Sequence, residues 1–329
     1  MAGTRVILPD PPVDEWLRLD SDPPVTFGAA GAAFLQFRAV KKSPRTMKKH
    51  TWLLGVLRPL WDQPLGGITA PELLRVLRRL ESTGKNETAA RAGMFTAAVF
   101  RYAIGEGWCT NNPARDLRGN LEGVVVQHHP AIVDPIEFGS LMLLVDQPGY
   151  SHRTVYNALR LIARTALRPG ELRHVLWSDV DRGKAEIVIP AERMKMRRPH
   201  LVPLSTQTIE ILEDQWQESG EAQSFVFPGV RPGRPMSDAG MNVALRNMFI
   251  TQAEHVPHGF RSSFSTLMNE RGEDAALIEL QLSHRKRDRI AGIYDRSERV
   301  PDRRVLMQKW ADYIDELKTQ ARNLAKAAK

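Results

Sequence analysis

The segment Thr165-Ala-Leu-Arg-Pro-Gly-Glu-Leu172 is the part of the sequence that decides the fold. Apolar residues lead up to it at helical spacing: Val155, Leu159, Ile162 and Ala166. They predict a buried helix that ends at the Pro-Gly turn, with Arg168 at its mouth. One arginine in a basic protein is usually a solvated surface charge, so Arg168 has to be interpreted together with other segments.

Three more segments contain side chains that can bind or transfer a phosphoryl group. Two predicted strands are joined by a basic stretch around Lys195, which indicates a hairpin with a cationic tip. In His258-Gly-Phe-Arg261 the histidine and the arginine are three residues apart, on one face of a helix start. His284 ends the triplet Leu-Ser-His and is followed ten residues later by Tyr294.

Together these segments supply a set of residues that suits metal-free phosphoryl transfer: Arg168, Lys195, His258, Arg261, His284 and Tyr294. Guanidinium groups offer a planar fork of donors to a phosphate and keep their charge. A lysine can protonate a leaving oxygen, histidines can move protons near neutral pH, and a tyrosine can act as a covalent nucleophile. The sequence shows neither a catalytic carboxylate pair nor an acidic cluster for magnesium, so no metal or other cofactor is expected.

In its order and spacing, this set resembles the signature of the tyrosine recombinases, also called phage integrases. Each of these residues taken alone is more often structural than catalytic, so the resemblance depends on the whole set. Flanking residues agree as well: Leu167-Arg-Pro-Gly-Glu-Leu172, Pro257-His-Gly-Phe-Arg261 and Leu282-Ser-His284. The stretches Ala191-Glu-Arg-Met-Lys-Met-Arg-Arg-Pro-His200 and Val202-Pro-Leu-Ser205 are similar to integrases of satellite phages and genomic islands. The resemblance extends over about residues 26–317 and includes Phe100-Arg-Tyr-Ala-Ile104.

The resemblance implies a site-specific enzyme that cuts and rejoins DNA through a 3′-phosphotyrosine bond and a Holliday junction. The two arginines and the two histidines of the set would hold the scissile phosphate. Tyr294 would attack phosphorus, and Lys195 would protonate the leaving 5′ oxygen. The expected partners are double-stranded DNA, further copies of the chain in a tetramer assembled on DNA from free monomers, and accessory DNA-bending proteins.

Two other functions remain open at this point. A DNA-binding regulator with the same fold would have lost catalysis, yet all six positions of the set are filled. A type IB topoisomerase would share the chemistry and relax supercoils without a partner strand. The order of the predicted domains fits a recombinase better.

The predicted fold class is mainly α with a small β-sheet (α+β), an all-α core-binding domain followed by a catalytic domain. We predict five parts: a flexible Pro-rich arm at 1–24, an all-α, SAM-like DNA-binding domain at 25–118, a linker at 119–134, the tyrosine recombinase catalytic domain at 135–317 and a tail at 318–329. The short arm argues against binding to separate arm-type DNA sites. Ser262 and Ser263 stand where many relatives have His-Thr, a difference without expected consequence.

Caps and periodicity predict the individual elements. Thr69 with Glu72, and Asp134 with Glu137, are capping boxes that begin helices. The predicted strands are residues 185–190 and 200–204, and the helices after them are 206–219, 238–252, 259–271 and 274–282. A last helix has an apolar stripe around Trp310, which would either dock onto a neighbouring protomer or cover its own domain.

The charge balance favours a polyanionic partner. The 329 residues include 46 Lys and Arg against 38 Asp and Glu, a formal net charge of +8. The candidate DNA contacts are Lys41, Lys42, Arg45, Lys48, Lys49, Arg197, Arg285, Lys286 and Arg287, with a solvated charged face as the alternative. The single Cys109 excludes an internal disulfide and fits a reducing cytoplasm, as expected for a bacterial or phage-encoded protein at the nucleoid, and no apolar run predicts a membrane partner.

Overall fold

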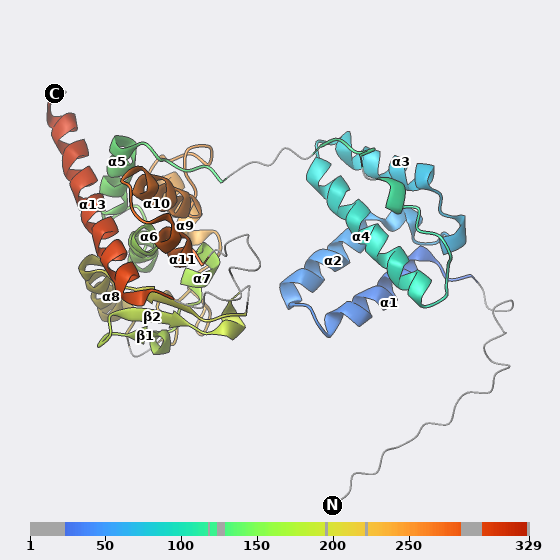
Figure 1. Cartoon of the computed structure of the whole chain (residues 1–329), viewed down its shortest axis with the longest axis horizontal. Helices are drawn as coiled ribbons and strands as arrows, with labels where there is room; N and C mark the ends of the chain where they lie inside the picture. Colours follow the sequence, from blue (N-terminus) through green and yellow to red (C-terminus); the bar gives the residue numbers. More distant parts are fainter. Residues whose placement is uncertain are drawn as a thin grey trace, which may run out of the picture. The chain divides into compact units, whose positions relative to one another are not determined.

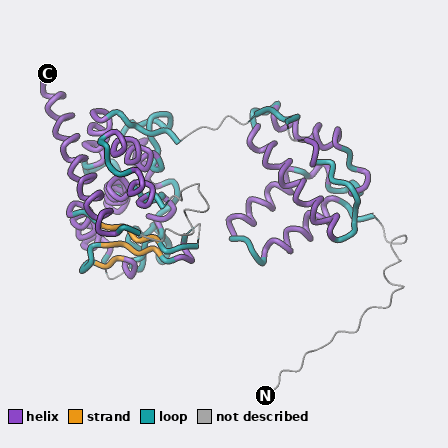
Figure 2. Tube along the Cα trace, in the orientation of Figure 1, coloured by secondary structure: helices purple, strands orange, loops and turns teal. Residues whose placement is uncertain are grey.

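The chain forms two compact units, residues 1–127 and 128–329, each built around a hydrophobic core of its own. The computed structural model describes residues 24–117, 119–123, 129–194, 197–220, 223–283 and 298–327. Within these ranges helices dominate, and the strands lie in the larger unit (Figures 1 and 2). The predicted class, mainly α with a small sheet, is confirmed.

The smaller unit is all-helical in its described part. Its elements are α1 (Phe27–Ala39), α2 (Pro44–Val56), α3 (Ala70–Glu81), α4 (Asn86–Gly105) and 3₁₀ turns at Arg58–Leu60, Leu65–Gly67 and Arg115–Leu117. The predicted capping box starts α3: the Thr69 hydroxyl accepts from the backbone of Glu72, and the Glu72 carboxylate accepts from the Thr69 backbone at 2.9 Å. Phe27 and Phe100 are fully buried between α1 and α4 and set the centre of this core.

The larger unit surrounds the buried helix predicted from the opening segment. Its helices are α5 (Pro135–Val145), α6 (Arg153–Thr165), α7 (Pro169–Arg173), α8 (Thr206–Ser219), α9 (Gly240–Asn247), α10 (Gly259–Glu270), α11 (Ala275–Gln281) and α13 (Val300–Ala327), with 3₁₀ turns at Trp177–Asp179 and Ala191–Arg193. Asp134 caps α5 through its carboxylate, as predicted. The helix predicted at 238–252 is shorter, because Phe249 takes a left-handed backbone conformation with a φ of 64°.

A three-stranded antiparallel sheet lies beside these helices. β1 (Val180–Asp181) pairs with β2 (Glu186–Ile189), and β2 pairs with β3 (His200–Pro203) in the order β1-β2-β3. The register places Ile189 opposite His200, so the connection between β2 and β3 contains Lys195. The two predicted strands are confirmed, whereas β1 was missed because two residues show no periodicity.

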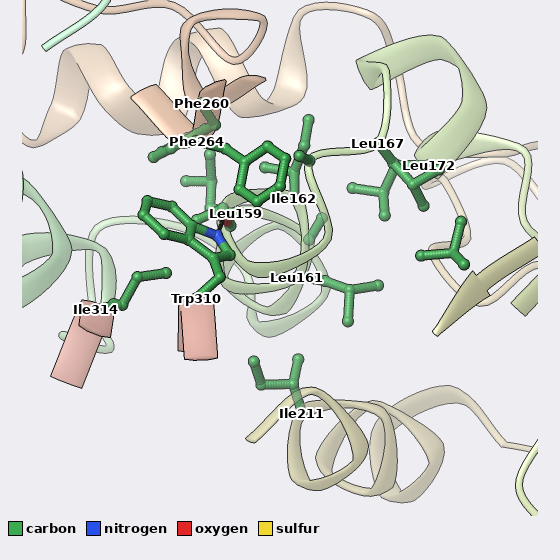
Figure 3. Close-up of a cluster of buried hydrophobic side chains, with 14 of the residues drawn as sticks. Leu159, Leu161, Ile162, Leu167, Leu172, Ile211, Phe260, Phe264, Trp310 and Ile314 are labelled. Atoms are coloured by element: carbon green, nitrogen blue, oxygen red, sulfur yellow. Dashed lines mark hydrogen bonds between the residues drawn. The ribbon is translucent and has the colours of Figure 1, made fainter. Parts of the chain in front are cut away.

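The final helix α13 covers its own unit. Trp310 is fully buried, donates its indole N–H to the carbonyl of Ala163 at 2.8 Å, and lies among Leu159, Ile162 and Phe264 (Figure 3). Gly139 of α5 lies so close to α13 that a Cβ would collide with the backbone there. The apolar stripe therefore packs in cis, the second of the two predicted options. No helix in the described ranges, α13 included, is both long and apolar enough to cross a membrane.

Candidate active site

Arg168 stands where the sequence places it, between the end of α6 and the start of α7. Ala166 ends α6 in a left-handed conformation, and Pro169 begins α7 directly after the arginine. Arg168 donates from Nη1 to the Glu171 carboxylate at 2.7 Å and from Nη2 to the carbonyl of Leu282 at 3.3 Å. Its side chain is 28% exposed, so part of it remains accessible to solvent.

Arg261 projects from the first turn of α10 and is only 4% exposed. It donates from Nη1 to the carbonyl of Ala166 and from Nη2 to the carbonyl of Leu282 at 2.7 Å. Burial, together with the positive charge of Arg168, lowers the pKa of Arg261 to about 10, so the group remains charged at neutral pH.

The two arginines therefore converge on one acceptor, the carbonyl oxygen of Leu282. Like charges this close repel each other, and the Glu171 carboxylate forms an ion pair with Arg168. Forked N–H donors suit the oxygens of a phosphate.

His258 lies at the N-cap of α10, three residues before Arg261, and is partly exposed. Its ring packs against that of His129 with centroids 4.4 Å apart. The nearby His255 has a different environment: it is fully buried, and its Nδ1 accepts from the backbone of Ile132 at 3.1 Å. Burial lowers the pKa of His255 to about 3, so this histidine is a neutral part of the core.

His200 is a buried histidine near the two arginines, and the sequence alone does not identify it as part of the site. It begins β3, is 5% exposed, and its Nε2 has no hydrogen-bond partner among the described residues. Its pKa is lowered to about 3 by burial and then by the positive charges of Arg303, Arg261 and Arg168. A histidine at the predicted start of a strand was a signal, but its position beside the arginines depends on tertiary packing.

Three of the six predicted catalytic residues lie in the described part. The structure brings Arg168 and Arg261 together at the carbonyl of Leu282, and His258 lies with Arg261 at the start of α10. Lys195, His284 and Tyr294 lie outside the described residues, as do Arg285, Lys286 and Arg287. Arg197, just after Lys195, is exposed.

The predicted DNA contacts of the smaller unit lie at the start of α2. Lys41, Lys42, Arg45, Lys48 and Lys49 all lie at the surface, and none of them forms an ion pair with another described residue. Ser43 caps the helix and Pro44 occupies its first turn. The surface cations thus surround a helix N-terminus, an arrangement that attracts phosphates.

Both parts of the chain are similar to known proteins. The phage integrase family model matches residues 137–299, and the phage integrase central domain model matches residues 27–120. The prophage integrase IntS of Escherichia coli (strain K12) is 33% identical over 316 residues, which cover 89% of this chain and 79% of IntS. The integrase of Shigella phage Sf6 shows the same identity and coverage.

Solved structures agree in fold. A lambda integrase tetramer bound to a Holliday junction matches with a TM-score of 0.66 at 19% identity, over 85% of this chain and 83% of that chain. The Tn1549 transposon integrase in complex with circular intermediate DNA matches with a TM-score of 0.63 at 16% identity, over 83% and 96% of the two chains. The predicted enzyme class, a DNA strand transferase, is confirmed by the relatives and family models. The chain belongs to the phage integrase family.

Proposed function

We propose that the chain is a site-specific DNA recombinase that forms a 3′-phosphotyrosine intermediate through Tyr294. The observation that carries this proposal is the convergence of Arg168 and Arg261 on the carbonyl of Leu282. That carbonyl directly precedes the segment with His284 and Tyr294, so the arginines are anchored where the proposed nucleophile segment begins.

In the proposed step the arginines hold the non-bridging oxygens of the scissile phosphate and stabilise the charge that grows on them. The phenolic oxygen of Tyr294 forms a bond to phosphorus while the bond from phosphorus to the 5′ oxygen breaks. The phenolic proton passes to a histidine of the set, His258 or His284, and Lys195 gives a proton to the leaving oxygen. The phosphodiester is exchanged for another phosphodiester, so the step is reversible by a 5′ hydroxyl.

The proposed partner is double-stranded DNA, bound as the integrase neighbours are bound to theirs. The surface cations at the start of α2 support this partner because they form no ion pairs with other described residues. We further propose that four copies exchange strands in pairs, that DNA-bending proteins assist, and that the enzyme acts on DNA in the cytoplasm. The lambda integrase tetramer on a Holliday junction supports the fourfold assembly.

A suicide substrate tests the proposal. A nicked duplex made from the DNA that flanks the gene releases a short fragment on cleavage and traps the covalent adduct. The wild-type chain is expected to form a denaturant-resistant adduct, and Tyr294→Phe to bind the DNA without forming it. Tyr150→Phe, which changes a partly buried tyrosine of the same unit, is the matched control and retains adduct formation. An adduct with Tyr294→Phe would contradict the proposal, and plasmid relaxation without strand exchange would favour a topoisomerase.

A further inference from the structure

A buried layer of polar side chains lies against the arginine pair. Gln281, the last residue of α11, is fully buried. Its amide donates to the carbonyl of Thr165 at 3.0 Å, and its Oε1 accepts two hydrogen bonds from Arg303, at 2.8 and 3.2 Å. The side chain thus links the end of α6 to the end of α11 and to α13.

The hydrogen bond between Gln281 and Thr165 lies next to the two carbonyls that accept from Arg261. Thr165 precedes Ala166, and Gln281 itself precedes Leu282. Arg261 donates to the carbonyls of Ala166 and Leu282, and Arg168 donates to the second of these. The bond from Gln281 to Thr165 therefore sets the separation of the two acceptors between which Arg261 lies.

Gln281 is held from the other side by a further buried residue, Arg303. Arg303 of α13 is 2% exposed and donates to the carbonyl of Leu201 at 2.6 Å as well as to Gln281. Arg303 therefore joins α13 to both β3 and α11, and its two hydrogen bonds to Oε1 leave the amide of Gln281 little freedom to turn away from Thr165.

We propose that Gln281 is a positioning residue for the Arg168–Arg261 pair, and that Arg303 holds it in that position. The inference rests on the proposed phosphoryl transfer and deepens it. Gln281 touches neither the phosphate nor the nucleophile in this account; it acts through the two carbonyls. A small displacement of the guanidinium groups from the phosphate oxygens is enough to slow a preorganised site.

The same unit contains a matched control. Gln215 of α8 is also fully buried, accepts from Asn157 at 3.1 Å and donates to Ser219 at 2.9 Å. Replacing either glutamine by methionine preserves the side-chain volume and leaves a buried polar group without its partner. Both substitutions remove buried hydrogen bonds, although Gln281→Met also removes an acceptor of the charged Arg303. Only Gln281→Met breaks a link to the arginine pair.

The experiment measures single-turnover cleavage of the suicide substrate at saturating protein, with DNA affinity determined in parallel. Gln281→Met is expected to cleave roughly 100-fold more slowly with unchanged DNA affinity, whereas Gln215→Met cleaves at the wild-type rate. In an Arg168→Lys background the slowing caused by Gln281→Met is expected to shrink, because the pair is already misplaced. Equal slowing by the two glutamine variants, or a wild-type rate for Gln281→Met, would overturn the inference.

Arg303→Lys provides a second variant if Gln281→Met does not fold. Lysine retains the buried positive charge but loses the fork that holds the Gln281 amide. Slower cleavage with unchanged DNA affinity supports the inference, and wild-type cleavage by Arg303→Lys overturns it. Lack of any adduct with the wild-type chain would instead overturn the proposed function itself, so the two failures are distinguishable.

Discussion

The two arginines of the site differ sharply in their surroundings, although both are predicted to hold one phosphate. Arg261 is buried and donates hydrogen bonds to two carbonyls. Arg168 is 28% exposed and donates to Glu171 and to one carbonyl. Arg261 is therefore the fixed member of the pair. Arg168 is the more exposed member.

This difference predicts unequal costs for replacement by lysine. Arg261→Lys keeps the charge but leaves one of two buried carbonyls without its charged donor, at a cost of about 1.5–3 kcal/mol in the free energy of unfolding. Arg168→Lys is expected to slow cleavage with a smaller loss of stability. Urea unfolding of both variants measures the difference, and equal decreases in stability would contradict the distinction between the two arginines.

The buried histidines predict a pH dependence of stability. The pKa values of His200 and His255 are lowered to about 3, while an unfolded chain titrates histidine near 6.5. Below this value the unfolded chain binds protons that the folded chain does not. Each histidine therefore reduces the free energy of unfolding by about 1.4 kcal/mol per pH unit as the pH falls from 6.5 towards 3, and the contribution is complete above 6.5.

Urea unfolding at about pH 7 and about pH 5.5 measures this slope. His255→Asn keeps an acceptor for the backbone of Ile132 and removes one of the two titrating groups. The variant is expected to lose about half of the histidine-dependent slope. An unchanged slope in His255→Asn would show that the acid sensitivity arises elsewhere.

Most helices and strands, and the two arginines of the site, are predictable from the sequence. The buried contacts of Gln281 behind these arginines are not. Strands β2 and β3 were predicted because their apolar residues alternate, and the caps marked the starts of α3 and α5. Gln281 was not predicted, because a buried polar side chain is identified by partners from distant elements. The left-handed conformation of Phe249, which shortens α9, also has no local signal in the sequence.

The cis packing of α13 has an energetic consequence. Trp310→Ala removes a fully buried ring and its hydrogen bond to Ala163, which should lower the free energy of unfolding by about 3–5 kcal/mol. Urea unfolding over a range of protein concentrations checks this. If the stripe instead packed on a neighbouring protomer, the substitution would weaken self-association and leave the stability of the monomer unchanged.

For the whole molecule, the net charge of +8 favours a polyanionic partner, and five exposed cations lie at the start of α2. The cations at the start of α2 lie on a different unit from the arginine pair, so affinity and chemistry are separable by mutation. The double variant Lys48→Ala/Lys49→Ala is expected to weaken binding to DNA of any sequence by a similar factor. The slope of log K against log salt should fall by about 0.9 for each DNA phosphate that the variant no longer neutralises.

Binding titrations at several salt concentrations measure that slope. Lys184→Ala, which removes an exposed lysine paired with Asp181 in the larger unit, is the matched control. The α2 variant should retain the wild-type cleavage rate once its DNA is saturated. A slope unchanged from that of the wild-type chain would remove α2 from the DNA interface.

The central claim, that an arginine pair presents a phosphate to Tyr294, is tested most directly by identifying the linked residue. The adduct trapped on the suicide substrate is digested with nuclease and protease, and the nucleotide-bearing peptide is sequenced by mass spectrometry. We expect a nucleotide joined through its 3′ phosphate to Tyr294, with a free 5′ hydroxyl on the released strand. A nucleotide on another side chain, or one joined through a 5′ phosphate, would contradict it.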